Sequence, residues 1–264
     1  MRVARFVTVP APARSPVSVP ARRPVSVPAR RPALVLTAHG SADPRSAASA
    51  YEVAHTIGMM RRDVDVRVAF CEQNSPTLRD VLAECRRNAV VVPLLLADAY
   101  HARIDIPALI ADSGAFAQQA DVLGEDDRLV HVLRQRLAHA GVSPLDPDVG
   151  VLVTAVGSSH PQANANTASV GEYLVQQTRW TATTAFATGP HPTPAEAADV
   201  LRKRGATRLV IAPWFLAHGR ITDRVAEYAR AQRILMAAPL GPHRLVAETL
   251  LDRFDEAIAA SAAA

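Results

Sequence analysis

The sequence predicts an α/β protein of two similar lobes, each built on a small parallel sheet that is flanked by helices. Short continuous apolar runs alternate with helix-length amphipathic segments, which is typical of parallel strands buried on both faces. The same order of strands, loops and helices occurs twice along the chain, which indicates an internal duplication. Two similar halves that face each other would form a cleft between them.

Three pairs of matching segments carry the duplication. They are "TAHGSADP" at 37–44 with "TAVGSSHP" at 154–161, "VPLLLA" at 92–97 with "APWFLA" at 212–217, and "LGEDDRLVHVLRQRL" at 123–137 with "LGPHRLVAETLLDRF" at 240–254. The offset lies between 117 (37 to 154) and 120 (92 to 212), which is too long a period for a solenoid. We therefore expect an N-terminal lobe with the metal site at 33–144 and a C-terminal lobe at 145–264.

Apolar runs of strand length predict the strands. They lie at 33–38, 64–70, 89–96 and 120–123 in the first half, and at 149–155, 181–187, 208–216 and 234–240 in the second. Apolar residues at three- and four-residue spacing predict helices between them, such as 128–140 and 195–204. A hydroxyl residue before a proline predicts two further helix starts, at Ser75 and at Thr193, where Glu196 completes a capping box.

Residues 1–32 differ in composition from the rest of the chain. They hold seven arginines, seven of the 20 prolines and no acidic residue. Proline at this density blocks helices and sheets, so we expect a disordered Pro/Arg-rich tail. The other residues carry 22 basic against 25 acidic side chains, so the net charge of +4 comes from the tail. A slightly acidic folded part argues against a nucleic-acid partner.

The composition favours a cytoplasmic protein. No apolar run approaches the length of a transmembrane helix, and the first residues lack the continuous apolar core of a secretory signal. Cys71 and Cys85 form no CxxC motif, so we expect reduced thiols rather than a disulfide framework. Phosphate-loop and dinucleotide-binding motifs are absent, which argues against nucleotide use. A homo-oligomer remains open at this point.

Three polar residues follow three successive strands of the first half. His39 follows the first strand, Glu72 the second, in "VAFCEQNSP", and His101 the third, in "LLLADAYHARIDIP". Ligands of open α/β sheets bind beyond the carboxyl ends of the strands, so these side chains can converge. Two imidazoles and one carboxylate suit a divalent ion such as Fe²⁺, Co²⁺, Ni²⁺ or Zn²⁺. We predict metal-binding and catalytic roles for all three residues.

The second half provides an internal test of this prediction. Val156 stands where His39 stands, Thr188 aligns approximately with Glu72, and "AHGRITDRV" has no clear histidine match to His101. The glycine and serine of the turn are kept in both copies, and these residues are what a tight turn needs. The turn therefore does not require the histidine, which favours a functional role for it.

Other polar side chains have a simpler interpretation. Histidines within the expected helices are expected to be solvated: His55, His131 and His139. Four residues near strand ends are expected to contact substrate: Ser41, Arg45, Arg103 and His218. Four arginines near the strand ends could bind carboxylates in a bidentate manner: Arg45, Arg103, Arg220 and Arg224.

The chain resembles the sirohydrochlorin chelatase family of ATP-independent class II chelatases. The matching stretches are "LTAHGSADPR", "VAFCEQNSPTL", "VPLLLADAYHARIDIP", "VGSSHP" and "APWFLAHGRITDRV", and the resemblance covers about residues 33–260. It implies a chelatase-like two-lobed fold with a tetrapyrrole cleft. It also implies that His39, Glu72 and His101 bind the metal ion and handle pyrrole protons. Two positions, Ala99 and His218, depart from the family's pattern.

The resemblance implies the insertion of Fe²⁺ into sirohydrochlorin to form sirohaem, with release of two protons. The metal would be a substrate and no cofactor would be permanently bound. Three alternatives stay open: a cobaltochelatase that inserts Co²⁺ for cobalamin synthesis, a carrier that binds metal or tetrapyrrole without catalysis, and a protoporphyrin ferrochelatase. The donor set alone does not separate Fe²⁺ from Co²⁺.

Overall fold

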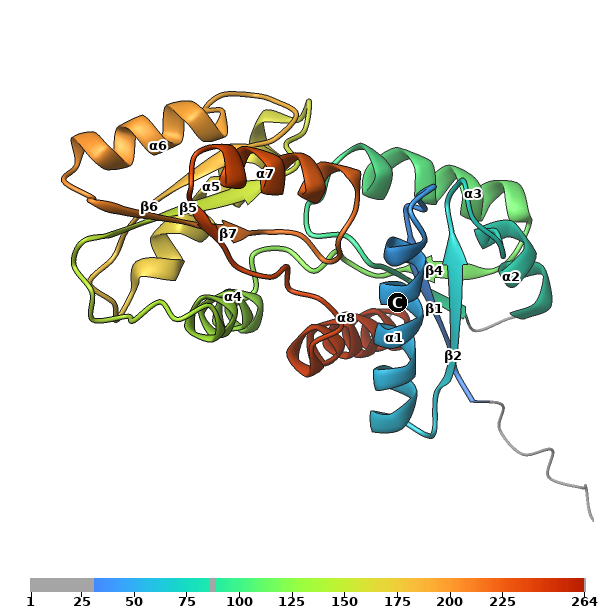
Figure 1. The fold of residues 1–264 in the computed structure, drawn as a ribbon. Helices are drawn as coiled ribbons and strands as arrows, with labels where there is room; N and C mark the ends of the chain where they lie inside the picture. Colours follow the sequence, from blue (N-terminus) through green and yellow to red (C-terminus); the bar gives the residue numbers. More distant parts are fainter. Residues whose placement is uncertain (1–30, 86–88, 264) are drawn as a thin grey trace, which may run out of the picture. The chain divides into compact units, whose positions relative to one another are not determined.

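The computed structural model describes residues 31–85 and 89–263, and these form two four-stranded parallel sheets flanked by helices (Figure 1). The prediction of two similar α/β lobes is confirmed. The disordered tail predicted at 1–32 lies outside the described residues, apart from its last two. In the part of the chain that the structure describes, no helix is long and apolar enough to cross a membrane.

The first sheet has the strand order β2-β1-β3-β4. Its strands are β1 Ala33–Ala38, β2 Asp65–Phe70, β3 Ala89–Pro93 and β4 Ala117–Gln119. The helical elements of this half are α1 Pro44–Met60, α2 Leu78–Cys85, the π-helical turn η1 His101–Asp105, α3 Ile106–Ser113 and α4 Asp127–His139. The central strands are wholly buried because helices cover both faces of the sheet, as in other parallel sheets.

The second sheet repeats this order as β6-β5-β7-β8. Its strands are β5 Val149–Ala155, β6 Thr181–Phe186, β7 Arg208–Pro213 and β8 Leu235–Met236. Its helices are α5 Pro161–Val175, α6 Pro194–Lys203, α7 Arg220–Ala231 and α8 Arg244–Ala263. Residues 39 and 156 follow β1 and β5 directly, so the two copies of the turn lie at equivalent places.

The strand predictions hold for the first three strands of each lobe and fail for the last one, β4 or β8. The strand predicted at 120–123 is wrong, because β4 ends at Gln119, and the one predicted at 234–240 is reduced to two residues. In both lobes the chain continues past the short edge strand with isolated hydrogen bonds. Leu123 donates to Leu95 at 3.0 Å, and Leu240 donates to Phe215 at 2.9 Å. Both leucines are buried although they are not part of a strand ladder, which explains why these segments are apolar.

One of the two predicted helix caps is wrong. Thr193 caps α6, and it forms the expected capping box with Glu196. Ser75 does not cap α2, which begins at Leu78. Thr77 takes that place, because its hydroxyl accepts a hydrogen bond from the backbone N–H of Asp80. A threonine three residues before an acid is the better signal here, since the two side chains also bond each other.

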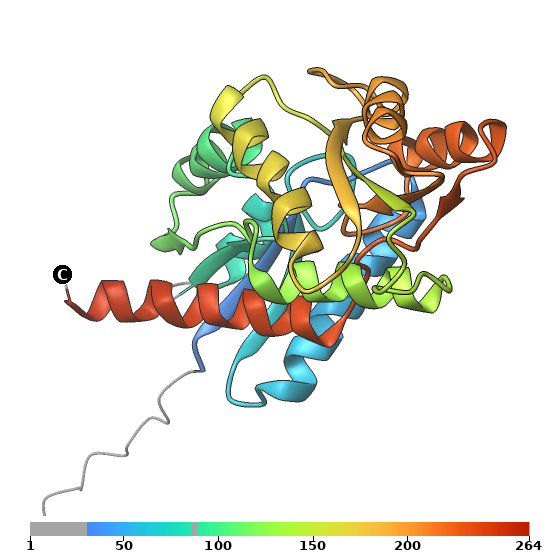
Figure 2. The ribbon, with the colours of Figure 1, turned by 90° about the vertical axis from the view of Figure 1, so that its left-hand side faces the viewer.

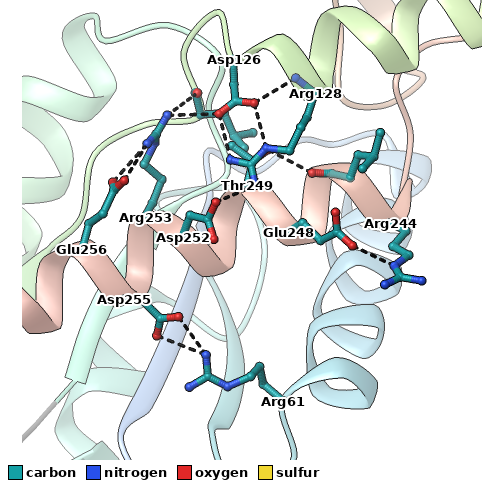
Figure 3. A network of polar contacts seen from close by, with 12 residues as sticks. Arg61, Asp126, Arg128, Arg244, Glu248, Thr249, Asp252, Arg253, Asp255 and Glu256 are labelled. Carbon is teal, nitrogen blue, oxygen red and sulfur yellow. Dashed lines mark hydrogen bonds and ion pairs between the residues drawn. The ribbon is translucent and has the colours of Figure 1, made fainter.

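The last helix of each half packs against the other half. Helix α4 contacts α5 and β7, whereas α8 contacts α1, β3 and α4 (Figure 2). Three ion pairs join α8 to residues of the first lobe: Arg61 with Asp255, Arg128 with Asp252, and Arg253 with Asp126 (Figure 3). Because α4 and α8 pack across the two halves, one hydrophobic core is shared by both lobes. It includes Leu36, Leu133, Val153 and Leu250.

Candidate active site

A groove runs beyond the carboxyl ends of the central strands of both lobes. It consists of two adjoining pockets of about 520 Å³ and about 390 Å³, which we call the larger and the smaller pocket. Both pockets are lined by His39, Leu94, Leu95, Phe215, Leu216 and Ile221. The groove therefore lies where ligands bind in open α/β sheets, and its shared lining is apolar except for one histidine.

The structure brings His39 and His101 together in the larger pocket. Their ring centroids are 3.9 Å apart, and the ring planes are tilted by 52°. His39 directly follows the end of β1, and His101 is the first residue of the π-helical turn η1. Such turns occur often at functional sites. Two imidazoles this close can reach one ion.

Glu72 is the second candidate donor near His39. Its Oε1 is 3.4 Å from Nδ1 of His39, and Gln73 donates a hydrogen bond to the same oxygen. Two donors about 2.1 Å from one tetrahedral ion are separated by about 3.4 Å. Nδ1 of His39 is buried and has no hydrogen-bond partner among the described residues. The His39–Glu72 spacing thus fits a shared ion better than a hydrogen bond.

A glycine explains why His39 and Glu72 meet. Gly40 has φ +101°, and a Cβ built on it would lie 1.8 Å from the carbonyl oxygen of Glu72. Only glycine permits this approach of the two loops. The amide of Glu72 donates to the carbonyl of His39 at 3.0 Å, and Asn74 accepts a hydrogen bond from the amide of Ser41. The turn therefore holds the two loops side by side.

Asp105 is a site residue that the sequence reasoning missed. Its Oδ2 lies 2.5 Å from Nδ1 of His101, one helical turn earlier. A carboxylate accepts only, so Nδ1 carries the proton and Nε2 keeps a free lone pair for a ligand. Carboxylates orient metal-binding histidines in this way. The signal was present in the sequence as a histidine and an aspartate at i and i+4.

Cys71 directly precedes Glu72 in the sequence. Burial, with smaller effects of the charges of Asp105 and Glu72, raises the pKa of its thiol to about 11. Without a metal ion the thiol therefore stays protonated near neutral pH, and metals bind the thiolate. Burial thus makes Cys71 a poorer candidate donor than the two imidazoles and the carboxylate.

The described residues contain no group of three or more His, Cys, Asp or Glu side chains arranged to hold a metal ion as they stand. Two donors are close to His39, but Glu72 is the exposed one, with 56% of its side chain accessible. An exposed carboxylate can rotate, so Glu72 can move onto an ion held by the histidines. An incomplete set suits an ion that must be released to a second ligand.

The four predicted substrate contacts separate into two groups. Ser41 and His218 line the smaller pocket. Arg45 instead pairs with Asp43 and with Asp223, both at 2.5 Å, and so joins α1 to α7. Arg103 pairs with Asp98. Neither arginine lines the two pockets.

Of the arginines expected near the strand ends, Arg220 is the one that lines the groove. Arg220 lies in the smaller pocket at the start of α7, near His218. The helix dipole and free backbone N–H groups at helix starts favour anions. The three helical histidines, His55, His131 and His139, are exposed as predicted.

The backbone pairing also fixes which residues of the second lobe match the candidate donors. Thr188 donates to the carbonyl of Val156 at 3.0 Å, as Glu72 does to that of His39. The predicted match of Thr188 to Glu72 is therefore confirmed. Ile221 matches His101, because each lies six residues after the carbonyl (Phe215 or Leu95) that accepts from the segment past the edge strand.

Comparisons with known proteins agree with this geometry. The protein-family model CbiX matches twice, at residues 33–140 and 150–257. A comparison with curated proteins found no match. Among solved structures, "SirB from Bacillus subtilis with Fe3+" aligns with a TM-score of 0.72 at 21% identity, covering 88% of this chain and 97% of that one.

Two further solved structures share the fold. The sirohydrochlorin chelatase SirB from Bacillus subtilis subspecies spizizenii in complex with cobalt has a TM-score of 0.65, 20% identity and coverage of 85% and 94% of the two chains. The structure described as CbiX, the terminal enzyme for biosynthesis of siroheme in denitrifying bacteria, has a TM-score of 0.64, 21% identity and coverage of 86% and 99%. Since two copies of one family model span both lobes, the chain belongs to the CbiX family of class II sirohydrochlorin chelatases.

Proposed function

We propose that this protein inserts Fe²⁺ into sirohydrochlorin to form sirohaem. The observation that carries the proposal is the pair His39–His101, with centroids 3.9 Å apart and Glu72 at 3.4 Å from His39, on the wall of a largely apolar groove. A flat macrocycle needs apolar walls, and an incoming ion needs a few exchangeable donors. Few functions need both in one place.

The two histidines would present the metal to the ring. Neutral imidazoles bind Fe²⁺ without adding charge, and Asp105 keeps Nε2 of His101 free for this task. Affinity must stay modest, because the ion has to leave for four pyrrole nitrogens. A partly hydrated site with two imidazoles and one mobile carboxylate suits transfer better than a closed structural site.

Glu72 is the group best suited to take up protons. Metal insertion releases the two pyrrole N–H protons as the nitrogen lone pairs bind the ion. A carboxylate beside His39, with 56% of its side chain exposed, can accept a proton and pass it to water. Charge is balanced, since one Fe²⁺ enters the ring and two protons leave.

The smaller pocket suits the acidic substituents of sirohydrochlorin. It combines Arg220, His218 and Ser41 with the starts of α1 and α7. Carboxylates are stabilised both by a guanidinium and by the positive end of a helix. Binding energy from these remote groups can hold and bend the ring, which exposes the nitrogen lone pairs.

The test is an anaerobic insertion assay on the purified protein. Sirohydrochlorin is mixed with Fe²⁺, and the absorbance change is timed with enzyme, without enzyme, and with protoporphyrin in place of sirohydrochlorin. The proposal expects many turnovers with sirohydrochlorin and few with protoporphyrin, which lacks most of the carboxylates. Stoichiometric binding without turnover would instead identify a carrier.

Cobalt is the second candidate metal. Two imidazoles and a carboxylate bind Co²⁺ as readily as Fe²⁺, so selectivity has to come from geometry and supply. Competition between equal concentrations of the two ions in the same assay separates the possibilities. A higher kcat/KM for Co²⁺ would assign the protein to cobalt insertion.

A further inference from the structure

The second lobe presents apolar side chains at two of the places where the first lobe presents donors. Val156 matches His39, and Ile221 matches His101, as the equivalent hydrogen bonds establish. Thr188, the match of Glu72, turns its hydroxyl back to the carbonyl of Val156 at 2.8 Å. The second lobe therefore offers no imidazole or carboxylate at these three positions.

Val156 and Ile221 line the same larger pocket as the two histidines. The imidazoles come from the N-terminal lobe and the two aliphatic side chains from the C-terminal lobe. Val156 is 39% exposed although it is aliphatic, and it belongs to no hydrophobic core cluster of the described residues. Core packing therefore does not explain why an aliphatic side chain stands at this position.

A macrocycle in this pocket would meet imidazoles from the first lobe and aliphatic side chains from the second. Its metal can approach only along the normal to the ring, so one face must be turned to His39 and His101. The other face needs a surface that binds it without offering a competing donor. Aliphatic side chains meet this need, because they gain free energy from burial and hold no metal.

We propose that Val156 and Ile221 are positioning residues that support the face of the macrocycle turned away from the histidines. This inference rests on the proposed function. It explains why the donors are lost from the second lobe while the turn is kept. Metal then enters from one face only, and the aliphatic wall keeps that face against the histidine pair.

The test compares the double variant Val156→Ala/Ile221→Ala with the wild type. The loss of about five buried methyl or methylene groups is expected to raise the KM for sirohydrochlorin about tenfold or more. The Co²⁺ dissociation constant, measured without tetrapyrrole, should stay within about twofold, because neither aliphatic side chain can bind a metal ion. Val200→Ala, an equally exposed valine on α6, is the matched control and should change neither quantity.

Val156→Ala alone is the second variant, since it removes an exposed side chain and leaves the core intact. Val156→Ile should restore the KM, which a merely structural defect would not allow. An unchanged KM in both alanine variants would overturn the inference, and so would a parallel loss of Co²⁺ binding.

Fluorescence quenching of sirohydrochlorin separates this inference from the proposed function. If the wild type binds the macrocycle but does not insert metal, the proposed function fails. The same titration still decides the role of the wall: weaker binding by the double variant supports it, and equal binding overturns it. A wild type that does not bind the macrocycle overturns both.

Discussion

At the ends of β1 and β5 the chain makes the same turn with different side chains. Gly40 and Gly157 have φ +101° and +94°, and each would place a Cβ within 2 Å of a carbonyl oxygen in the neighbouring loop, at 1.8 Å and 1.7 Å. The residue before the glycine is His39 in one lobe and Val156 in the other. The backbone is thus set by glycine and pairing register, and the chemistry by the side chains added to it.

The comparison separates scaffold from function within one chain. The glycine kept in both lobes serves the turn, and the residue before it, His39 or Val156, lines the larger pocket. The ion pairs between the lobes differ as well. Arg45 on α1 pairs with Asp223 on α7, whereas their matches by sequence offset, Gln162 and Arg103, form no such pair among the described residues.

The largest expected effect comes from removing an imidazole. His39→Ala or His101→Ala is expected to lower kcat for metal insertion by about 10²–10⁴-fold, because each removes a metal donor and a group that handles protons. Insertion rates and Co²⁺ affinity are measured together. His55→Ala removes an exposed imidazole from α1 and serves as the control. A His39→Ala enzyme as fast as the wild type would contradict the assignment.

Asp105→Asn is the next prediction in size. The amide is uncharged and can adopt the wrong hydrogen-bonding sense toward Nδ1 of His101, so Co²⁺ affinity should fall about 10–100-fold. Isothermal titration with Co²⁺ measures it. Asp112→Asn, at an exposed position of α3, should leave the affinity unchanged. Equal affinities for the two variants would remove Asp105 from the site.

Adding the donors to the second lobe sharpens the comparison further. The variant V156H/T188E/I221H recreates the donor set on the equivalent backbone and should bind a second equivalent of Co²⁺. Val225 stands where Asp105 stands, so the new site lacks the orienting carboxylate. We expect it to bind about 10–100-fold more weakly than the first site. A stoichiometry that stays at one would mean that the two backbones differ more than their hydrogen bonds indicate.

The smallest effect concerns stability rather than activity. Asp43 is the N-cap of α1, and hydrogen bonds from Arg45 lower the pKa of its carboxyl from 3.8 to about 2. A lowered native pKa stabilises the fold above the ordinary pKa, and this stabilisation is lost as the pH falls through about 2. His160 is the N-cap of the equivalent helix α5 in the second lobe, so that helix has no N-cap carboxylate with a lowered pKa.

Asp43→Asn tests this prediction, because asparagine keeps the cap but does not titrate. The wild type should be the more stable protein near neutral pH, and the difference should shrink as the pH approaches about 2. Urea unfolding at several pH values measures it. A difference that does not change with pH would show that the charge of Asp43 does not stabilise the fold.

The sequence was sufficient for three of the four strands in each sheet and insufficient for β4 and β8. It also singled out the two histidines that the structure brings together. Continuous apolar runs locate β1 and β5 to the residue, because both faces of these strands are buried. The segments at 120–123 and 234–240 are also largely apolar, but most of their buried residues, such as Leu123 and Leu240, lie outside the strand ladders. Local composition does not distinguish these two kinds of burial.

Long-range packing was likewise not predictable from local pattern. The matching segments at 123–137 and 240–254 predicted equivalent helices, but not that each would pack against the opposite half. Arg45 and Arg103 had the right charge for substrate carboxylates, yet acidic neighbours engage both. Asp105 was overlooked although its i+4 spacing from His101 was visible in the sequence, and the structure adds the direction of the imidazole toward it.

The asymmetry of the two lobes is tested most directly by locating the metal. Crystals grown with Co²⁺, measured at the cobalt absorption edge, would give anomalous peaks at bound ions. The account predicts one strong peak within bonding distance of His39 and His101, with Glu72 turned toward it, and no peak beside Val156 and Ile221. A peak of equal strength in the second lobe, or a single peak away from the histidine pair, would contradict it.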